Sequence, residues 1–346
     1  MQYFILAFAL SLVATYAVKK FAERAGIVDR PDEKVKKHKK AVPLLGGLAI
    51  FLSFWLVVAY LAFFTNLFGA NLQPQKLIMV FIASVPLMII GYFDDKHKLP
   101  AVWRLGLSAV CVLLLVLGGL GLNKITNPFG GVLYLDFWQI NLGFLGYFSL
   151  VSGSLVFLWI IGMMYTTKIL DGLDGLSTGI ASIASFMIFF IANGERWHQP
   201  DVALLSLVFA GACLGFLVFN FYPAKIFLGE GGSLFVGFML GVLSVISGGK
   251  IATALLVMAV PILDLARVVF VRARKGQSIF KGDREHMHFR LLDLGFSHRQ
   301  TVLLYYTIAF IFGITTLFFQ SIQKLFALAV LLALMCLFGF WLGKKE

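Results

Sequence analysis

The sequence predicts an all-α polytopic membrane protein, and three observations support this fold class. Hydrophobic residues make up 60% and charged residues 13% of the 346 residues, whereas a soluble domain carries about 25% charged residues. Apolar stretches of bilayer-spanning length, roughly 17–25 residues each, recur along the chain. Basic residues concentrate in every second connection between these stretches. We therefore expect a single integral membrane domain over residues 1–346 with about eleven transmembrane helices.

The predicted spans are taken from the apolar stretches in chain order. They are 2–18, 44–65, 77–93, 103–121, 149–167, 176–192, 203–219, 232–247, 250–270, 302–320 and 325–343. Residues 1–18 lack the basic start and the cleavage site of a signal peptide, so we interpret them as the first span. Residues 123–146, between the fourth and fifth spans, predict one small extramembrane hairpin.

The distribution of Lys and Arg predicts the orientation of the chain. Basic residues are enriched in cytoplasmic loops of membrane proteins. With the N-terminus outside and the C-terminus in the cytoplasm, the outer segments hold few of the 29 basic residues, namely Lys76, Lys124, Arg196, Lys250 and Lys324. The predicted cytoplasmic loops are then approximately 19–43, 94–102, 168–175, 220–231 and 271–301.

Acidic residues gather at one kind of place, the cytoplasmic ends of spans three, five, seven and nine. They are Asp94 and Asp95, Asp171 and Asp174, Glu230, and Asp264 with Asp283. Ionisable groups are costly in a membrane protein and usually serve its function. A small acidic pocket on a net-positive face suits an anionic substrate that binds through a divalent cation. Helix capping is the alternative for a single Asp.

Asp171 and Asp174 are three residues apart, so a helical turn would present both carboxylates on one face. The glycines around Glu230 predict a tight turn into a helix start, which favours an anion such as phosphate. Close helix packing is the alternative explanation for these glycines.

The loop 272–300 is basic, and attraction to anionic lipid headgroups would explain most of its charge. His286 and His288 are two apart, so one helix face cannot present both. Spaced His or Cys partners for zinc are lacking. We therefore favour diphosphate binding by these histidines together with Arg284.

Taken together, the motifs resemble the polyprenyl-phosphate N-acetylhexosamine-1-phosphate transferases of glycosyltransferase family 4. The ordered set runs through Asp29, Pro31, His38, Pro43 and Gly46-Gly47, then Gly91–Asp95, Leu170–Leu176, Asn220–Ser233, Pro261 with Asp264, and Asp283–His288. The resemblance implies transfer of a sugar 1-phosphate from a UDP-sugar to undecaprenyl or another polyprenyl phosphate, with release of UMP. It also implies Mg²⁺, with Mn²⁺ as an acceptable substitute, and an active site on the cytoplasmic face of the bacterial plasma membrane. Such a reaction is the first membrane step of cell-envelope glycan synthesis.

The resemblance also implies residue roles. Asp94 matches the base that deprotonates the lipid phosphate, with Asp95 beside it. Asp171 and Asp174 match metal and nucleotide positions, and Glu230 matches a magnesium ligand. Asn220 and Phe227 match the residues that contact uracil, and His286 and His288 match those that contact the pyrophosphate. Further candidate substrate-binding residues are Arg284, Lys168 and His38. Direct attack by the lipid phosphate and a covalent aspartyl intermediate both remain open.

Three residues depart from the family pattern. Lys168 stands where Asn is usual, and a protonated lysine cannot bind Mg²⁺. Glu230 replaces an Asp, and Phe289 replaces a His. The first two changes fall in the implied metal site, which leaves open a repositioned ion or a divergent or inactive member.

Within the family, the Asp283–His288 loop, the span count and Ser297–Gln300 resemble the N-acetylglucosamine-1-phosphate branch. The first alternative is the branch that makes lipid I from UDP-N-acetylmuramoyl-pentapeptide. An anion transporter is the alternative of another class, but transporters place their key charges near the bilayer midplane. The expected partners are a UDP-sugar and a polyprenyl phosphate lipid, a homodimer is compatible, and no nucleic-acid partner is expected.

Overall fold

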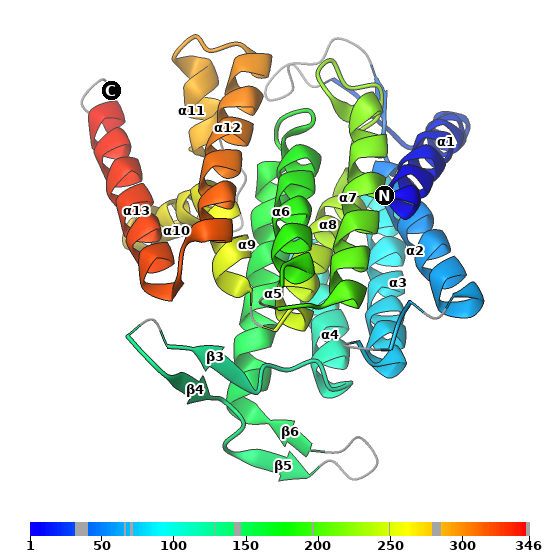
Figure 1. The fold of residues 1–346 in the computed structure, drawn as a ribbon. Coiled ribbons are helices and arrows are strands. Elements are labelled where there is room, and N and C mark those ends of the chain that lie inside the picture. Colours follow the sequence, from blue (N-terminus) through cyan, green and yellow to red (C-terminus); the bar gives the residue numbers. More distant parts are fainter. Residues whose placement is uncertain are drawn as a thin grey trace.

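The computed structural model describes residues 1–31, 41–65, 67–69, 72–127, 129–141, 147–195, 197–248, 250–278 and 285–343. Figure 1 shows a helical bundle with small strand pairs at its two ends. The helices are α1 Gln2–Arg24, α2 Gly46–Phe64, α3 Pro74–His97, α4 Ala101–Leu117, α5 Leu150–Leu170, α6 Leu176–Asn193, α7 Pro200–Asn220, α8 Gly229–Ile246, α9 Ile251–Val257, α10 Ala259–Arg274, α11 Met287–Asp293, α12 His298–Phe318 and α13 Ser321–Gly343.

The predicted all-α membrane class is confirmed at the level of its helices. In the part of the chain that the structure describes, eight helices are long and apolar enough to cross a bilayer, and the bent pair α9–α10 brings this number to nine. Helix α4 and the central part of α13 are apolar but shorter. Each predicted span overlaps a helix or this bent pair, whereas the count of eleven and the orientation stay predictions.

The predicted ninth span, 250–270, was wrong as a continuous helix. The chain bends by 78° between α9 and α10. Pro261 explains the break, because it has no backbone N–H to donate to the carbonyl of Val257, the last residue of α9. Helical hydrogen bonding resumes at once, with the Ile262 N–H donating to the Met258 carbonyl at 2.9 Å.

Helix α8 is the most deeply buried of the candidate spans in the described chain. Glycines let α2 and α3 approach its backbone closely. A Cβ on Gly47 would lie 1.9 Å from Gly232 Cα, and a Cβ on Gly91 would lie 2.1 Å from Gly231 Cα. Such contacts between small residues bring membrane helices together. They fix the first turn of α8, and therefore Glu230, against the end of α3.

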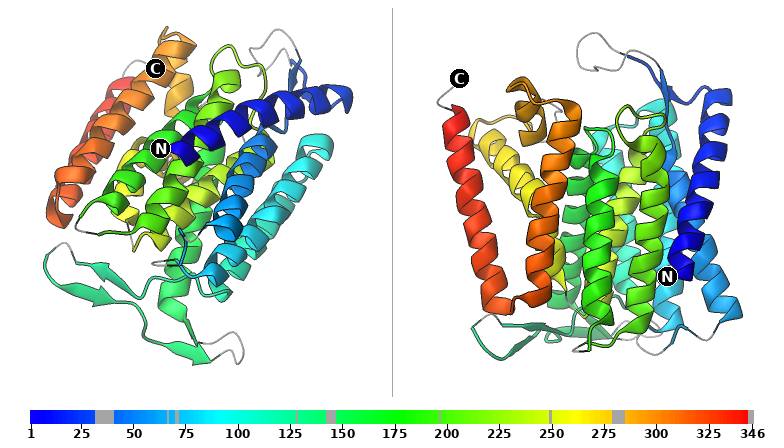
Figure 2. Two further views of the ribbon diagram at one scale, coloured as in Figure 1. Left: turned by 45° about the vertical axis from the view of Figure 1, so that its right-hand side comes forward. Right: turned by 45° about the horizontal axis from the view of Figure 1, so that its top comes forward.

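The single hairpin predicted over 123–146 was also wrong, because the structure forms two strand pairs. Strand β3 Lys124–Thr126 pairs with β4 Val132–Tyr134, and β5 Gln139–Asn141 pairs with β6 Tyr147–Ser149, all antiparallel. The second pair uses residues just beyond the predicted segment. Both pairs lie at the end of the bundle opposite α11 in Figures 1 and 2.

At the α11 end, β1 Val28–Asp29 pairs with β2 Val42–Pro43 and closes the first inter-helix connection. One apolar core cluster joins buried side chains from α1 to α13. Helix α13 lies at the edge of the bundle, beside α10 and α12 (Figure 2). The single domain over residues 1–346 stays a prediction.

Candidate active site at one end of the bundle

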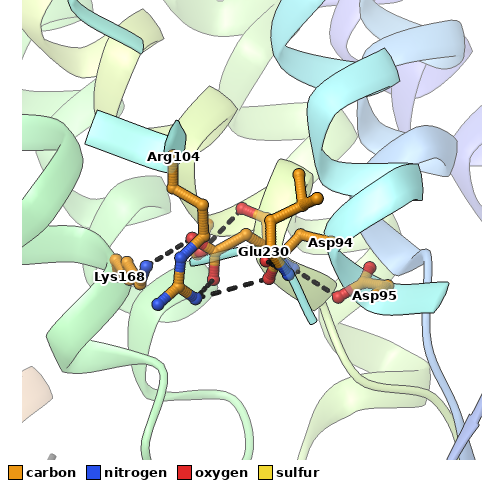
Figure 3. Close-up of polar contacts among 7 residues, drawn as sticks. Asp94, Asp95, Arg104, Lys168 and Glu230 are labelled. Carbon is orange, nitrogen blue, oxygen red and sulfur yellow. Dashed lines mark hydrogen bonds and ion pairs between the residues drawn. The ribbon is translucent and has the colours of Figure 1, made fainter. Parts of the chain in front are cut away.

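Most of the predicted acidic residues lie at or near helix ends on one end of the bundle, whereas Asp264 lies within α10 and Asp283 lies outside the described residues. Asp94 and Asp95 lie in the last turn of α3, Asp171 caps the C-terminus of α5, and Glu230 lies in the first turn of α8. Figure 3 shows Asp94, Asp95 and Glu230 together with two basic side chains, Arg104 and Lys168. The chain therefore brings carboxylates from α3 and α8 into contact with cations from α4 and α5.

Asp94 is buried, with 7% of its surface exposed, and accepts from two donors. Its Oδ1 accepts the Leu99 N–H at 2.8 Å, and its Oδ2 lies 3.4 Å from Arg104 Nη1. The first contact stabilises the turn after α3, where Lys98 is left-handed with φ 52°. The second is an ion pair with the first turn of α4. Asp94 is thus held rigidly at the site, beside a positive charge.

Asp95 makes a different contact, with the N-terminus of α8. Its Oδ1 accepts the Glu230 N–H at 3.0 Å. A helix N-terminus leaves backbone N–H groups free to bind an anionic group, and here a carboxylate takes that place. Gly229 makes the approach feasible, because it has φ 78° and a Cβ there would lie 2.5 Å from Asp95 Oδ2. The glycine-rich motif therefore serves both helix packing and the position of Asp95.

Glu230 is paired with two cations. Its Oε1 forms an ion pair with Lys168 Nζ, and its Oε2 lies 3.7 Å from Arg104 Nη1. Arg104 also contacts Asp94, so it bridges two carboxylates from different helices. Our sequence reasoning did not single out Arg104. A charged residue at the inner end of an apolar span was the signal that could have found it.

Asp171 and Asp174 lie in the short connection between α5 and α6, and the helical turn predicted for them was wrong. The connection is a non-helical turn that ends at Gly175, which has φ 79°. Asp174 Oδ2 accepts the Ala224 N–H at 2.9 Å. Removal from water raises the pKa of the Asp171 carboxyl well above its ordinary value, and the carboxylates of Asp174, Asp95 and Glu230 raise it further, against a hydrogen bond from Ser177. These carboxylates therefore share one electrostatic field that favours a cation.

Asn220 is buried at the end of α7 and links two connections. Its Oδ1 accepts the Gly175 N–H at 3.1 Å, and its Nδ2 donates to the Ile226 carbonyl at 3.0 Å. The Phe227 N–H donates to the Pro43 carbonyl at 2.8 Å, and the Phe227 carbonyl accepts the Gly46 N–H at 3.0 Å. These bonds hold the 171–175 and 221–228 connections in place, and uracil binding by Asn220 and Phe227 stays a prediction.

Helix α11 is anchored to α10 through Asp264. Asp264 Oδ2 lies 2.9 Å from His286 Nδ1 and accepts the Met287 N–H at 3.1 Å. Arg267 donates to Asp264 Oδ1 at 2.9 Å and to the Glu285 carbonyl at 2.5 Å. The deep acid of the ninth predicted span therefore holds the start of α11 beside the site.

His286 and His288 lie side by side although, as expected, one helix face does not present both, because only His288 lies within α11. Their rings are stacked at 5.8 Å with an interplanar angle of 4°. His286 precedes the helix in an extended conformation, which removes the helical offset between the two residues. His288 faces the acidic turn, since a Cβ on Gly172 would lie 2.8 Å from His288 Nε2.

Burial lowers the pKa of His288 to about 3, so its ring is neutral at ordinary pH. Its Nε2 is buried, and it has no hydrogen-bond partner among the described residues. A buried polar atom without a partner normally has a reason, such as a bound group. This is the feature that best fits the predicted contact with a ligand. His38 and Arg284, the other two predicted substrate-binding residues, lie outside the described residues.

The predicted divalent ion fits this site only in part. Within the described ranges, no group of three or more His, Cys, Asp or Glu residues is placed to bind a metal ion. Glu230 is engaged with Lys168 and Arg104. Asp95 accepts the Glu230 N–H, and the charged groups that act on Asp171 are the carboxylates of Asp174, Asp95 and Glu230. The charge around Asp95 and Asp171 fits a cation, and the contacts of Glu230 favour another role.

Comparison with known proteins identifies the family. The model of glycosyl transferase family 4 matches residues 77–248, the segment that carries Asp94, Asp95, Lys168, Asp171 and Glu230. A probable undecaprenyl-phosphate N-acetylglucosaminyl 1-phosphate transferase of Bacillus subtilis is 31% identical over 326 residues, which cover 92% of this chain and 84% of the relative. The chain belongs to glycosyl transferase family 4.

Two further relatives extend this result across bacteria. A decaprenyl-phosphate N-acetylglucosaminephosphotransferase of Mycobacterium tuberculosis is 33% identical over 86% of this family 4 chain and 76% of its own length. An undecaprenyl-phosphate alpha-N-acetylglucosaminyl 1-phosphate transferase of Escherichia coli is 27% identical over 86% of this chain and 77% of its own. The predicted family and the predicted N-acetylglucosamine-1-phosphate branch are confirmed.

Proposed function

We propose that this chain transfers N-acetylglucosamine 1-phosphate from UDP-N-acetylglucosamine to undecaprenyl or another polyprenyl phosphate, releasing UMP. The observation that carries the proposal is the cluster of Asp94, Asp95, Glu230, Arg104 and Lys168 at one end of an apolar bundle. Such a cluster suits a reaction between two phosphate groups at a membrane surface. The names of the Bacillus and Mycobacterium relatives support the polyprenyl phosphate acceptor and the transferred N-acetylglucosamine phosphate group.

The reaction joins two anions, so the site must offset negative charge and remove a proton. An oxygen of the lipid phosphate attacks the phosphorus that bears the sugar. The bond from this phosphorus to the bridging oxygen breaks, and UMP leaves with that oxygen. Asp94 would accept the proton of the lipid phosphate, with Asp95 beside it. Arg104 and Lys168 offer charge-assisted hydrogen bonds to phosphate oxygens.

We also propose Mg²⁺ as the cofactor, with Mn²⁺ as an acceptable substitute. Asp171 and Asp95 are the residues that would hold it, because hard carboxylate oxygens suit Mg²⁺ and no ion pair among the described residues engages either carboxylate. A bound ion would offset charge on the diphosphate. The other residues would keep separate tasks, namely proton acceptance by Asp94 and phosphate binding by Arg104 and Lys168.

The other predicted residues would contact the diphosphate and the nucleotide. His288, with its buried free Nε2, and His286 would contact the diphosphate from α11, together with Arg284. Asn220 and Phe227 would border the uracil, and Asp174 would support this turn. His38 stays a candidate substrate-binding residue. The site would face the cytoplasm of the bacterial plasma membrane, with the N-terminus outside. A homodimer is compatible with this arrangement.

The test uses the full chain, purified in detergent and reconstituted with undecaprenyl phosphate. We expect UMP release with UDP-N-acetylglucosamine and none with UDP-N-acetylmuramoyl-pentapeptide. Asp94→Asn should lower the rate by at least about a hundredfold, as loss of a general base does, whereas Asp293→Asn, an exposed carboxylate on α11, should not. Release with the pentapeptide substrate alone would assign the chain to lipid I synthesis instead.

Anion transport is the competing class of function. The described acids lie mainly at helix ends, whereas transporters use charges near the midplane, often at broken helices. The bend at α9–α10 places only Asp264 near such a break, and Asp264 is bound to His286 and Arg267. Uptake of a labelled anion into proteoliposomes, without a lipid product, would favour transport.

A further inference from the structure

We propose that Lys168 is a built-in cation of this site, and that Glu230 positions Lys168 and Arg104 instead of binding a divalent ion. The family resemblance implies an Asn at position 168 and an Asp at position 230, both suited to a metal site. This chain has a Lys and a Glu there, and the structure joins the two in an ion pair. The role of this ion pair in the reaction rests on the proposed function, whereas the ion pair itself is seen in the structure independently of that function.

The packing of α5 on α8 places the two residues opposite each other. Lys168 lies in the last turn of α5, and Glu230 lies in the first turn of α8. The helices approach closely along glycines, since a Cβ on Gly237 would lie 2.5 Å from the Met163 carbonyl oxygen. The ammonium also lies 5.4 Å from the ring centroid of Tyr165, a distance that permits a cation–π contact. Lys168 is therefore held in place from two sides.

Both oxygens of Glu230 are involved with positive charge. Lys168 contacts Oε1, and Arg104 lies 3.7 Å from Oε2 while also contacting Asp94. The Glu230 side chain is 11% exposed, so water screens these charges poorly. A divalent ion on Glu230 would have to approach two cations or displace one of them. The four side chains already balance as two cations and two anions.

The two departures from the family pattern are thus explained together. Each change alone would damage a metal site, because a lysine cannot ligate an ion and a glutamate shifts its carboxylate by one methylene. In combination they form a compensated pair, in which the longer acid meets the new ammonium. In the proposed reaction, that ammonium would bind a phosphate oxygen, and any divalent ion would be held by Asp171 and Asp95 without Glu230.

The test measures Mn²⁺ binding to the purified full chain by electron paramagnetic resonance, without nucleotide or lipid. With Lys168 present, Glu230→Gln should change the Mn²⁺ affinity of the chain by less than about twofold, because Glu230 does not bind the ion. Lys168→Asn should raise the affinity by about tenfold or more, and Lys168→Asn/Glu230→Gln should lose that gain, which is the signature of direct coupling. Lys225→Asn, an exposed lysine at the same end, controls for net charge. Circular dichroism and apparent melting temperatures confirm that each variant is folded.

Two results would overturn the proposal. One is a tenfold loss of Mn²⁺ affinity in Glu230→Gln with Lys168 present, which would make Glu230 a ligand. The other is no gain in Lys168→Asn beyond that in Lys225→Asn, including the case in which neither binds Mn²⁺. Because no substrate is used, a chain without transferase activity would still give a clear answer. Failure of the proposed function would show separately, in the UMP assay.

Discussion

At the residue scale, the site depends on a few side chains that each hold two helices. Arg104 contacts Asp94 on α3 and Glu230 on α8. Asp95 contacts the Glu230 N–H, and Asp264 holds α11 through His286 and Met287. Together these contacts fix the positions of the ends of α3, α4, α8 and α11 relative to one another. Substitutions at these residues should therefore change catalysis more than overall folding.

Arg104 gives the first prediction. Arg104→Ala leaves Asp94 and Glu230 without their shared cation, so UMP release should fall by about ten- to a hundredfold, the effect of losing a hydrogen bond to a charged group. Arg104→Lys should recover only part of the rate, because an ammonium cannot present the planar fork of a guanidinium. Steady-state UMP assays measure both variants. An unchanged rate in Arg104→Ala, with Lys96→Ala as the exposed control, would remove Arg104 from the site.

Gly229 gives the second prediction. Gly229→Ala places a Cβ 2.5 Å from Asp95 Oδ2 at a residue with φ 78°. Backbone strain of this kind costs about 1–3 kcal/mol, so the apparent melting temperature and the UMP rate should both fall. Gly162→Ala is the matched control, since its Cβ meets no atom within 4 Å in the middle of α5. Equal effects of the two substitutions would contradict the proposed role of the Gly229 turn.

At the element scale, the sequence was sufficient to locate the helices but not their breaks or their partners. Long apolar stretches predicted the positions of the long helices, because hydropathy reports burial in lipid directly, whereas the count of eleven spans stays a prediction. The bend at Met258 was missed because it arises from a single residue, Pro261, which cannot donate a hydrogen bond to the Val257 carbonyl. The second strand pair, β5–β6, was missed because it uses residues beyond the predicted hairpin. The acids were predicted to meet at one end from chain order alone. Arg104 was missed, because its contacts depend on how α4 rotates against α3 and α8.

Helix α11 gives a prediction at this scale. Asp264→Asn removes the charge that binds Arg267 and His286, so α11 should detach from the acidic turn near Gly172. Hydrogen–deuterium exchange of residues 287–293 should become about tenfold faster, as expected for a locally destabilised segment, while α12 stays unchanged. Asp293→Asn, at the exposed end of α11, is the control. Slow exchange in Asp264→Asn would show that packing alone holds α11.

At the scale of the whole molecule, the two ends of the bundle have different chemistry. The acidic and basic cluster lies at one end, and strand pairs with exposed aromatic side chains such as Phe129 lie at the other. The distribution of Lys and Arg predicts that the first end faces the cytoplasm. The confirmed family agrees with an enzyme embedded in a membrane, and the orientation is a prediction of the same account.

Thiol labelling in intact cells tests the orientation. A membrane-impermeant maleimide should label Phe129→Cys in an outer strand connection and should not label Lys225→Cys until the cells are opened. Cys111 and Cys213 are buried and should contribute little background. The reverse pattern would place the site on the outside and would contradict a supply of UDP-sugar from the cytoplasm.

The measurement that tests the central claim most directly follows the phosphorus atoms of the donor. The purified chain is incubated with undecaprenyl phosphate and UDP-N-acetylglucosamine that carries a radiolabel in either the α- or the β-phosphate. If the proposed bond breaks, label from the β-phosphate enters the lipid product, and label from the α-phosphate stays with UMP. Transfer of α-label to the lipid, or no lipid label from either donor, would contradict the proposed reaction.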